Sequence, residues 1–138
     1  MDVDAIETLI RELLPLAVLV TPNIPEAERL TSMEITTEAD MLSAAAALRK
    51  MGAKAVLIKG GHLRKQNPVN TVEAIDVLND NGLITVYRGE RVPQVDLHGS
   101  GCRLSAAIAV GLGKGLSLKD SVGQAKQFVL ELILKAAE

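Results

Sequence analysis

Two short apolar runs constrain the fold of this chain more than any other feature. They are AVLV at residues 17–20 and the run at residues 55–59 within KAVLIKGG, and segments of helical periodicity separate them. A short apolar run bounded by turn residues is typical of a buried strand of a parallel sheet. Strands that alternate with helices indicate an α/β fold. We therefore expect helices that cover a mostly parallel sheet.

Local signals predict the remaining elements. The segments VEAIDVLND and LITVYRGE flank the pair Asn81-Gly82, which predicts a β-hairpin. Thr37 and Asp40 have the spacing of a capping box, so a helix is expected to begin there and to stop at Gly52. Apolar residues at helical spacing predict further helices over residues 3–14 (ended by Pro15), from Asn23 onward, and over residues 101–113 and 118–137.

The composition excludes several classes of function. The chain has 138 residues, of which 48% are hydrophobic, and this is enough for one domain with a modest core. One Phe, one Tyr and no Trp leave no stacking platform for single-stranded nucleic acid. A net charge of −2 without a basic run argues against nucleic acid and anionic membranes as partners.

The cysteine count and the N-terminal residues bear on the compartment. One Cys rules out an internal disulfide and suits a reducing environment. The acidic start, MDVDAIETLI, does not resemble a signal peptide. We expect a cytoplasmic protein. His62, His98 and Cys102 are too scattered to predict a metal-ligand cluster.

The motif HGSGC at residues 98–102 leads into an alanine-rich helix and places the only Cys at the junction. Backbone N–H groups from Gly99 to Cys102, at the positive end of a helix dipole, suit a phosphate, and the same field lowers the pKa of a thiol. The structural alternative is a glycine-rich turn in which Ser100 caps the helix and Cys102 is a small buried apolar residue. A short glycine motif does not decide between the two.

Two further motifs place polar side chains after predicted strands. In PNIPEAE, the spacing of Asn23 and Glu26 suits either a capping box or a pair of oxygen groups that hold hydrated Mg²⁺ beside nucleotide phosphates. In LIKGGH, Lys59 precedes Gly60 and Gly61 at the C-terminal end of a strand, where open α/β sheets bind ligands. This lysine is either a phosphate contact or a solvated residue before a turn.

Other titratable residues give weaker signals. His62 and His98 each flank a glycine pair or turn, and a structural role is favoured for both over a catalytic one. Asp76 and Asp80 flank the predicted hairpin, where turn formation and solubility are the expected roles.

The order and spacing of the three motifs resemble the ribokinase-like family of small-molecule kinases. Within that family, the segments LVTPNIPEAERLT, AVLIKGGHL, IDVLND and HGSGCRLSAAIAVGLGKGLSLKDSVGQAKQFV are most similar to the C-terminal half of the hydroxymethylpyrimidine and phosphomethylpyrimidine kinases of thiamine biosynthesis. The Cys in GSGC is the more specific sign, because the related sugar kinases carry Asp at that place. The resemblance implies the C-terminal part of a ribokinase-like three-layer sandwich.

The resemblance also implies roles for the residues of the HGSGC motif. Gly99, Ser100 and Gly101, together with Cys102, would form the anion hole that stabilises the transferring γ-phosphoryl group. Cys102 would be the general base that takes the proton of the substrate hydroxymethyl group. Positioning and charge stabilisation are what phosphoryl transfer mostly requires, so these roles are physically coherent.

The other two motifs receive roles at the nucleotide. Lys59, Gly60 and Gly61 would contact the nucleotide phosphates. Asn23 and Glu26 would organise Mg²⁺ and its water shell. The implied cofactors are therefore ATP and Mg²⁺, and the implied substrate is a small pyrimidine.

The chain departs from the family pattern in sequence and in length. Thr usually follows the Cys, where this chain has Arg103, and Asn-Thr or Asp-Thr usually precedes the His, where it has Asp96-Leu97. Family members are longer, and their N-terminal half carries most of the sheet and most contacts to the pyrimidine. We therefore expect residues 1–138 to form a single partial domain, the nucleotide-binding and catalytic half, which pairs with itself or with a missing N-terminal half.

Two other interpretations stay open. The chain is a fragment of a pyridoxal or pyridoxine kinase, since vitamin B6 kinases share the fold and some carry Cys at the base position. Alternatively, it is a non-catalytic fragment that self-associates through an exposed sheet edge and apolar face. Nucleotide binding, turnover and oligomeric mass distinguish these interpretations.

Overall fold

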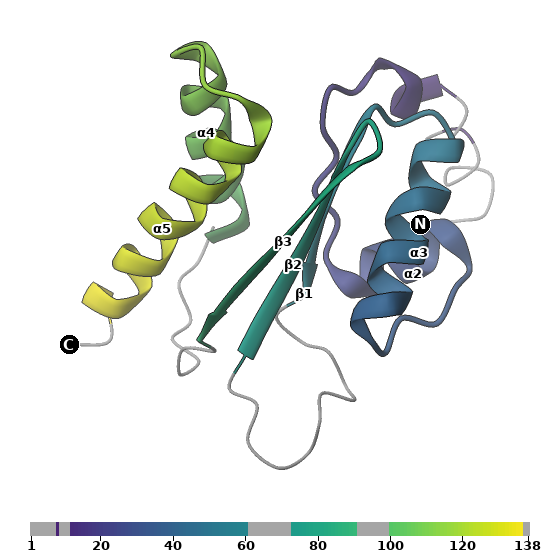
Figure 1. Ribbon diagram of the computed structural model, residues 1–138, viewed down its shortest axis with the longest axis horizontal. Coiled ribbons are helices and arrows are strands. Elements are labelled where there is room, and N and C mark those ends of the chain that lie inside the picture. Colours follow the sequence, from purple (N-terminus) through teal and green to yellow (C-terminus); the bar gives the residue numbers. More distant parts are fainter. Residues whose placement is uncertain (1–7, 9–11, 61–72, 91–99, 137–138) are drawn as a thin grey trace. The chain divides into compact units, whose positions relative to one another are not determined.

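The computed structural model describes residues 8, 12–60, 73–90 and 100–136. The chain divides into two compact units, residues 1–90 and residues 91–138. The first unit contains a sheet with helices packed on it, and the second contains a pair of helices (Figure 1). Among the residues described, no helix combines the length and the apolar character that crossing a membrane requires.

The sheet of the first unit has three strands in the order β1-β2-β3. These strands span Ala55–Gly60, Glu73–Asp80 and Leu83–Glu90, and both neighbouring pairs are antiparallel (Figure 1). The α/β class, the strand near residues 55–59 and the hairpin are confirmed. The prediction of a mostly parallel sheet is wrong for the described part of the chain, because β2 returns beside β1 in the opposite direction.

Residues 17–20 do not form the buried strand that their apolar character predicts. Val20 makes only an isolated parallel bridge to β1, with backbone hydrogen bonds of 2.8 and 3.1 Å. The ladder is interrupted at Pro22, which has no N–H to donate, although its carbonyl accepts a hydrogen bond from the Lys59 N–H at 3.0 Å. Val18 is 64% exposed, so the prediction of burial is wrong as well.

The hairpin turn follows from its two central residues. Asn81 and Gly82 have φ values of +52° and +95°, and a type I′ turn needs positive φ at both positions. The side chain of Asn79 accepts a hydrogen bond from the Gly82 N–H at 2.9 Å. Arg49 donates to the side chain of Asn81 at 2.9 Å and so ties the turn to the preceding helix.

Helices α2 (Ile24–Thr31) and α3 (Glu38–Lys50) pack against the sheet. Both begin with the capping boxes that the sequence predicts, at Asn23 and at Thr37. Helix α3 ends before Gly52, whose φ of +122° suits a glycine. The core between α3 and the strands consists of fully buried apolar side chains, which include Ile35, Met41, Leu48, Val56, Ile58 and Val77.

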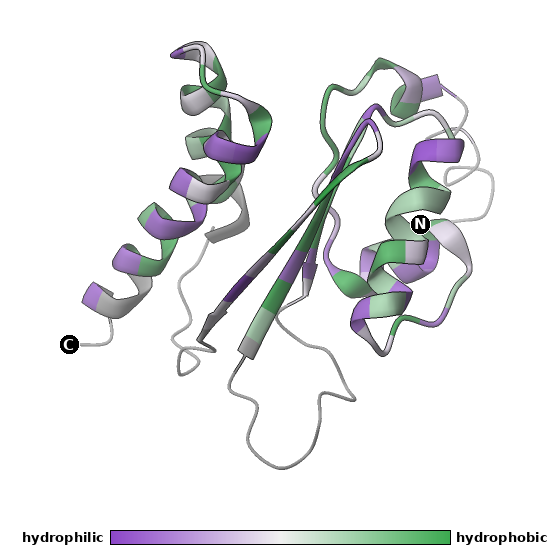
Figure 2. Cartoon of the chain, viewed as in Figure 1, coloured by the Kyte–Doolittle hydropathy of each residue, from purple (hydrophilic) through white to green (hydrophobic). Residues whose placement is uncertain are grey.

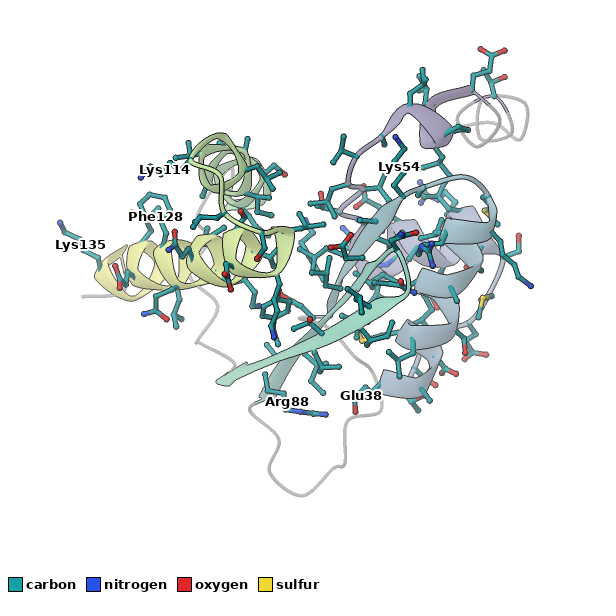
Figure 3. The ribbon with its side chains drawn as sticks, turned by 45° about the horizontal axis from the view of Figure 1, so that its top comes forward. Glu38, Lys54, Arg88, Lys114, Phe128 and Lys135 are labelled. Carbon is teal, nitrogen blue, oxygen red and sulfur yellow. The ribbon has the colours of Figure 1, made fainter. Side chains whose placement is uncertain are left out.

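Hydrogen bonds at the start of α3 stabilise the charged form of Asp40. The backbone N–H of Thr36 donates to Asp40 Oδ2 at 2.9 Å, and the hydroxyl of Thr36 and the N–H of Thr37 donate to the same oxygen. These hydrogen bonds favour the charged carboxylate and lower the pKa of Asp40 from its ordinary value of 3.8. Arg88 of β3 pairs with Glu38 at 2.6 Å and links the sheet to the same helix end (Figure 3).

The second unit is a helical hairpin of α4 (Ser100–Gly113) and α5 (Leu118–Ala136), which confirms the two predicted C-terminal helices. Hydrophilic and hydrophobic residues alternate along α5, as expected for a helix with one buried face (Figure 2). The two helices are in contact, and their buried apolar side chains include Leu104, Ile108, Val122 and Ala125. A mostly apolar groove of about 690 Å³ lies along both helices, with Lys114 and Phe128 in its lining (Figure 3).

The N-terminal helix predicted over residues 3–14 falls mostly outside the described residues. Within them, Leu14–Leu16 form a short 3₁₀ helix that contains Pro15. The proline therefore lies inside a helical turn rather than at the end of one. Its fixed φ and missing N–H are compatible with the first turn of a helix, which explains the difference.

Candidate functional site

Lys59 and Asn23, which separate motifs single out, are neighbours in the structure. Lys59 is the next to last residue of β1, and its N–H donates to the Pro22 carbonyl at 3.0 Å. Asn23 and Lys59 also form a parallel bridge. The structure thus brings Asn23 and Lys59 together at the C-terminal end of β1, where α2 begins.

Asn23 and Glu26 cap the N-terminus of α2 reciprocally. The N–H of Glu26 donates to Asn23 Oδ1 at 2.8 Å, and the N–H of Asn23 donates to Glu26 Oε1 at 3.0 Å. The capping alternative is therefore confirmed for this pair. Both side chains are exposed, and Glu26 Oε2 has no hydrogen-bond partner among the described residues. One oxygen of the Glu26 carboxylate is therefore available to a cation.

Gly60 is fixed by close packing at the end of β1. A Cβ atom at this position would lie 1.9 Å from the carbonyl oxygen of Ile75 and 2.7 Å from Cε of Met41. The first distance involves backbone, so no side-chain rotation relieves it. A glycine is therefore required at the end of β1 on steric grounds alone.

Asp76 has a structural role in this region that differs from the turn or solubility role predicted from the sequence. It is not a turn residue, because it lies inside β2 opposite Lys59 and is 7% exposed. Its Oδ1 accepts a hydrogen bond from the N–H of Gly60 at 2.9 Å. A charged residue between Ile75 and Val77 in an apolar strand was the available signal, since a carboxylate is rarely buried without partners. Asp80, in contrast, ends β2 beside the turn, as expected.

The HGSGC motif belongs to the second unit, at the start of α4. The helix begins at Ser100, so Gly101 and Cys102 are part of its first turn. The N–H groups of a first turn have no acceptor within the helix and carry the positive end of its dipole, which suits an anion. The side chains of residues 100–103 lie outside the described part of the structure, as do all atoms of Gly61, His62, His98 and Gly99.

The described residues contain no group of three or more His, Cys, Asp or Glu side chains that could hold a metal ion. A divalent cation near Glu26 would therefore take most of its ligands from phosphate oxygens and water. Mg²⁺ is usually bound in this way, through one or two carboxylates, substrate phosphates and several waters. The exposed Glu26 carboxylate is consistent with a hydrated cation of this kind, which needs few protein ligands.

Comparison with known proteins identifies similar sequences. A family model described as phosphomethylpyrimidine kinase matches residues 1–138. A hydroxymethylpyrimidine/phosphomethylpyrimidine kinase from Rhizobium meliloti (strain 1021) is 44% identical over 136 residues, which cover 98% of this chain and 48% of that protein.

Two solved structures are similar to the chain. The pyridoxal kinase from Staphylococcus aureus in complex with AMP-PCP and pyridoxal matches with a TM-score of 0.83 and 34% identity, over 94% of this chain and 47% of that one. The phosphomethylpyrimidine kinase from Clostridium difficile 630 matches with a TM-score of 0.76 and 36% identity, over 96% of this chain and 50% of that one. The chain therefore spans about half the length of these relatives.

Proposed function

We propose that this chain, which belongs to the phosphomethylpyrimidine kinase family of thiamine biosynthesis, is the ATP-binding and catalytic half of such a kinase. The reaction is the transfer of the γ-phosphoryl group of ATP to the hydroxymethyl group of hydroxymethylpyrimidine, and then to the resulting monophosphate. The family match over the whole chain carries the proposal, and the adjacency of Asn23 and Lys59 supports it. In this proposal residues 1–138 are one partial domain of a ribokinase-like three-layer sandwich.

Lys59, Gly60 and Gly61 contact the nucleotide phosphates in this proposal. Lys59 is partly exposed at the end of a strand whose other residues are buried, so a rigid element presents its charge. A lysine ammonium meets a phosphate as a compact point charge with three donors. The packing of Gly60 against β2 holds the end of β1, and therefore the backbone next to Lys59, in one position.

Asn23 and Glu26 hold Mg²⁺ and its water shell in the same proposal. The free oxygen of Glu26 and the absence of a closed cage among the described side chains fit a hydrated ion that binds chiefly through phosphates. When bound, Mg²⁺ neutralises charge on the phosphates during transfer. The capping hydrogen bonds fix the Glu26 carboxylate at the start of α2, so it is oriented before the ion arrives.

Cys102 is the proposed general base. A thiol in the first turn of a helix has a lowered pKa, which favours the thiolate near neutral pH. The thiolate takes the proton of the hydroxymethyl group as that oxygen bonds to the γ-phosphorus, and the bond to the ADP oxygen breaks. The N–H groups of Gly99, Ser100 and Gly101 stabilise the charge on the transferring phosphoryl group.

Titration calorimetry of the chain with ATP and Mg²⁺ tests the nucleotide site. We expect saturable binding that Lys59→Gln weakens about tenfold, which corresponds to the loss of one charge-assisted contact. Lys54→Gln is the matched control, because Lys54 is an exposed lysine just before the other end of β1. An equal loss in both variants, or no binding by the folded chain, would overturn the proposed site.

A pyridoxal kinase fragment is the second candidate. The similarity to the Staphylococcus aureus pyridoxal kinase favours it. Both substrates are nitrogen heterocycles that carry a hydroxymethyl group. Initial rates with each substrate, measured after the chain is joined to the other half of the Rhizobium meliloti or of the Staphylococcus aureus kinase, decide which ring the completed enzyme prefers.

A further inference from the structure

Asp76 is a buried residue that the proposed reaction does not use. It is 7% exposed, and its neighbours in β2, Ile75 and Val77, belong to the apolar core on which α2 and α3 pack. Successive side chains of a strand point to opposite faces, so Asp76 lies on the other face of the sheet. A carboxylate is costly to bury, and a charge within the apolar pattern of a strand is typical of a functional position.

The cross-strand partner of Asp76 is Lys59. The two residues lie directly opposite each other in the antiparallel pairing of β1 with β2 (Figure 1). Side chains at such positions lie on the same face of the sheet, with Cβ atoms about 5 Å apart. Lys59 forms no ion pair with Asp76 or with any other described residue. Asp76 therefore lies beside Lys59 and leaves the charge of the ammonium available to an anion.

The backbone of Lys59 is held by hydrogen bonds on two sides. Its own N–H donates to the Pro22 carbonyl at 3.0 Å. The next N–H, that of Gly60, donates to Asp76 Oδ1 at 2.9 Å in a buried hydrogen bond. The Gly60 N–H belongs to the peptide group that directly follows Lys59, so this hydrogen bond restrains the Lys59 backbone from its C-terminal side. Asp76 thus holds the residue that presents the ammonium, without contacting the ammonium itself.

We infer that Asp76 is a positioning residue for the contact between Lys59 and the nucleotide phosphates. The hydrogen bond to Gly60 fixes the direction in which the Lys59 side chain leaves the sheet. A group that is held in place before its ligand arrives loses less freedom on binding, so the fixed lysine binds phosphate more tightly. The role requires an acceptor oxygen and not a charge, so asparagine can fill it. This inference rests on the proposed function.

Titration calorimetry of this chain with ATP and Mg²⁺ measures the contribution of Asp76 to affinity. We expect Asp76→Ala to raise the dissociation constant about five- to tenfold, and Asp76→Asn to change it less than about twofold because the acceptor oxygen stays. Asp80→Ala is the matched control and is expected to leave the affinity unchanged. Asp80 lies on the same face at the other end of β2, where it is opposite Ala55. Equal losses of affinity in Asp76→Ala and Asp76→Asn would overturn the inference.

A double-mutant cycle separates the positioning of Lys59 from a general loss of structure. Once Lys59→Gln has removed the ammonium, Asp76→Ala has no lysine to misplace, and we expect it to weaken ATP binding less than about twofold further. Val77→Ala opens a cavity in the core on the opposite face of β2 and is expected to lower stability but not ATP affinity. Fully additive losses for Lys59 and Asp76, or an equal loss of affinity in Val77→Ala and Asp76→Ala, would overturn the inference.

Two outcomes distinguish a failure of this inference from a failure of the proposed function. No ATP binding by any of the folded proteins would overturn the proposed function and the inference with it. An unchanged affinity in Asp76→Ala, in a chain that binds ATP, would overturn the inference alone.

Amide hydrogen exchange tests the hydrogen bond itself and needs no nucleotide. We expect the Gly60 N–H to exchange at least about tenfold faster in Asp76→Ala than in Asp76→Asn, because only the asparagine variant keeps an acceptor. Asp76→Leu, which keeps the buried volume, takes the place of Asp76→Ala where the smaller side chain prevents folding. Equal exchange rates at Gly60 in the variants with and without the acceptor would contradict the inference.

Discussion

Asp76 Oδ1 accepts a hydrogen bond from the backbone N–H of Gly60. Gly60 ends β1 and follows Lys59, a residue of the candidate site. The carboxylate is nearly buried, and it lies opposite Lys59 in the strand pairing. Its hydrogen bond holds the last backbone N–H of β1, in addition to the ladder bonds between the two strands. At the residue scale, Asp76 is therefore a positioning residue for the end of β1.

Substitution of Asp76 separates the hydrogen bond from the charge. Asp76→Ala leaves the buried Gly60 N–H without this acceptor, and we expect a loss of about 1–3 kcal/mol in the free energy of unfolding. Asp76→Asn retains an acceptor oxygen, so a smaller loss is expected. Urea denaturation of both variants measures the difference. Equal losses of unfolding free energy in the two variants would show that the charge of Asp76, and not its hydrogen bond to Gly60, stabilises the fold.

Asp40 gives the fold an acid-sensitive residue. Its pKa is lowered in the folded chain, chiefly by the hydrogen bond from the Thr36 backbone, so its contribution to stability is fully present above the unfolded value of 3.8. The contribution is lost as the pH falls through the lower folded value. We expect the melting temperature of Asp40→Asn to fall less than that of the unchanged chain between about pH 6 and pH 3. Parallel curves for the two proteins would contradict this assignment.

The packing of α4 on α5 depends on a glycine at the element scale. A Cβ atom at Gly111 would lie 2.8–3.1 Å from atoms of Ser121, which is fully buried at the start of α5. We expect Gly111→Ala to destabilise the chain by about 1–3 kcal/mol through overpacking. Gly113→Ala is the control in the same helix, because nothing lies within 4 Å of its added Cβ.

Thermal unfolding followed by circular dichroism distinguishes these two alanine variants. Gly113→Ala is expected to be neutral or slightly stabilising, since Ala has the higher helix propensity. If Gly113→Ala loses as much stability as Gly111→Ala, the loss comes from replacing a glycine near the end of α4 and not from the close contact with Ser121.

Local signals account for most of the elements that the sequence predicts correctly. The capping boxes at Asn23 and Thr37, the Asn81-Gly82 turn and the apolar period of α5 each depend on residues a few positions apart. The direction of β1 relative to β2 cannot be predicted from such local signals, because it depends on the path of the chain between the two strands. The strand expected at residues 17–20 was incomplete because Pro22 lacks one donor.

The candidate site was predictable to the same extent. Asn23 and Lys59 stood out by motif, and Lys59 was expected at the carboxyl end of a strand, where open α/β sheets bind ligands. Their adjacency is a finding of the structure. The steric requirement for Gly60 and the burial of Asp76 were not predictable, because both depend on the antiparallel pairing of β1 with β2. That pairing is a long-range contact which the hydrophobic pattern alone does not determine.

At the scale of the whole molecule, the motifs with proposed functional roles are divided between two compact units. The first unit contains Asn23, Glu26 and Lys59, and the second contains Cys102. The chain also spans about half the length of its relatives. We therefore expect nucleotide binding by the chain itself and phosphoryl transfer only after the complementary half is supplied. A non-catalytic, self-associating fragment would instead form homo-oligomers and bind nucleotide weakly or not at all.

The most direct test is phosphoryl transfer by the completed kinase. The chain is joined to the unmatched portion of the Rhizobium meliloti kinase, and hydroxymethylpyrimidine, ATP and Mg²⁺ are supplied. The account predicts that hydroxymethylpyrimidine phosphate forms, and that Cys102→Ala slows its formation at least about a hundredfold, because a general base is lost. A folded, nucleotide-binding protein that forms no phosphorylated product, or one that works equally well without Cys102, would contradict it.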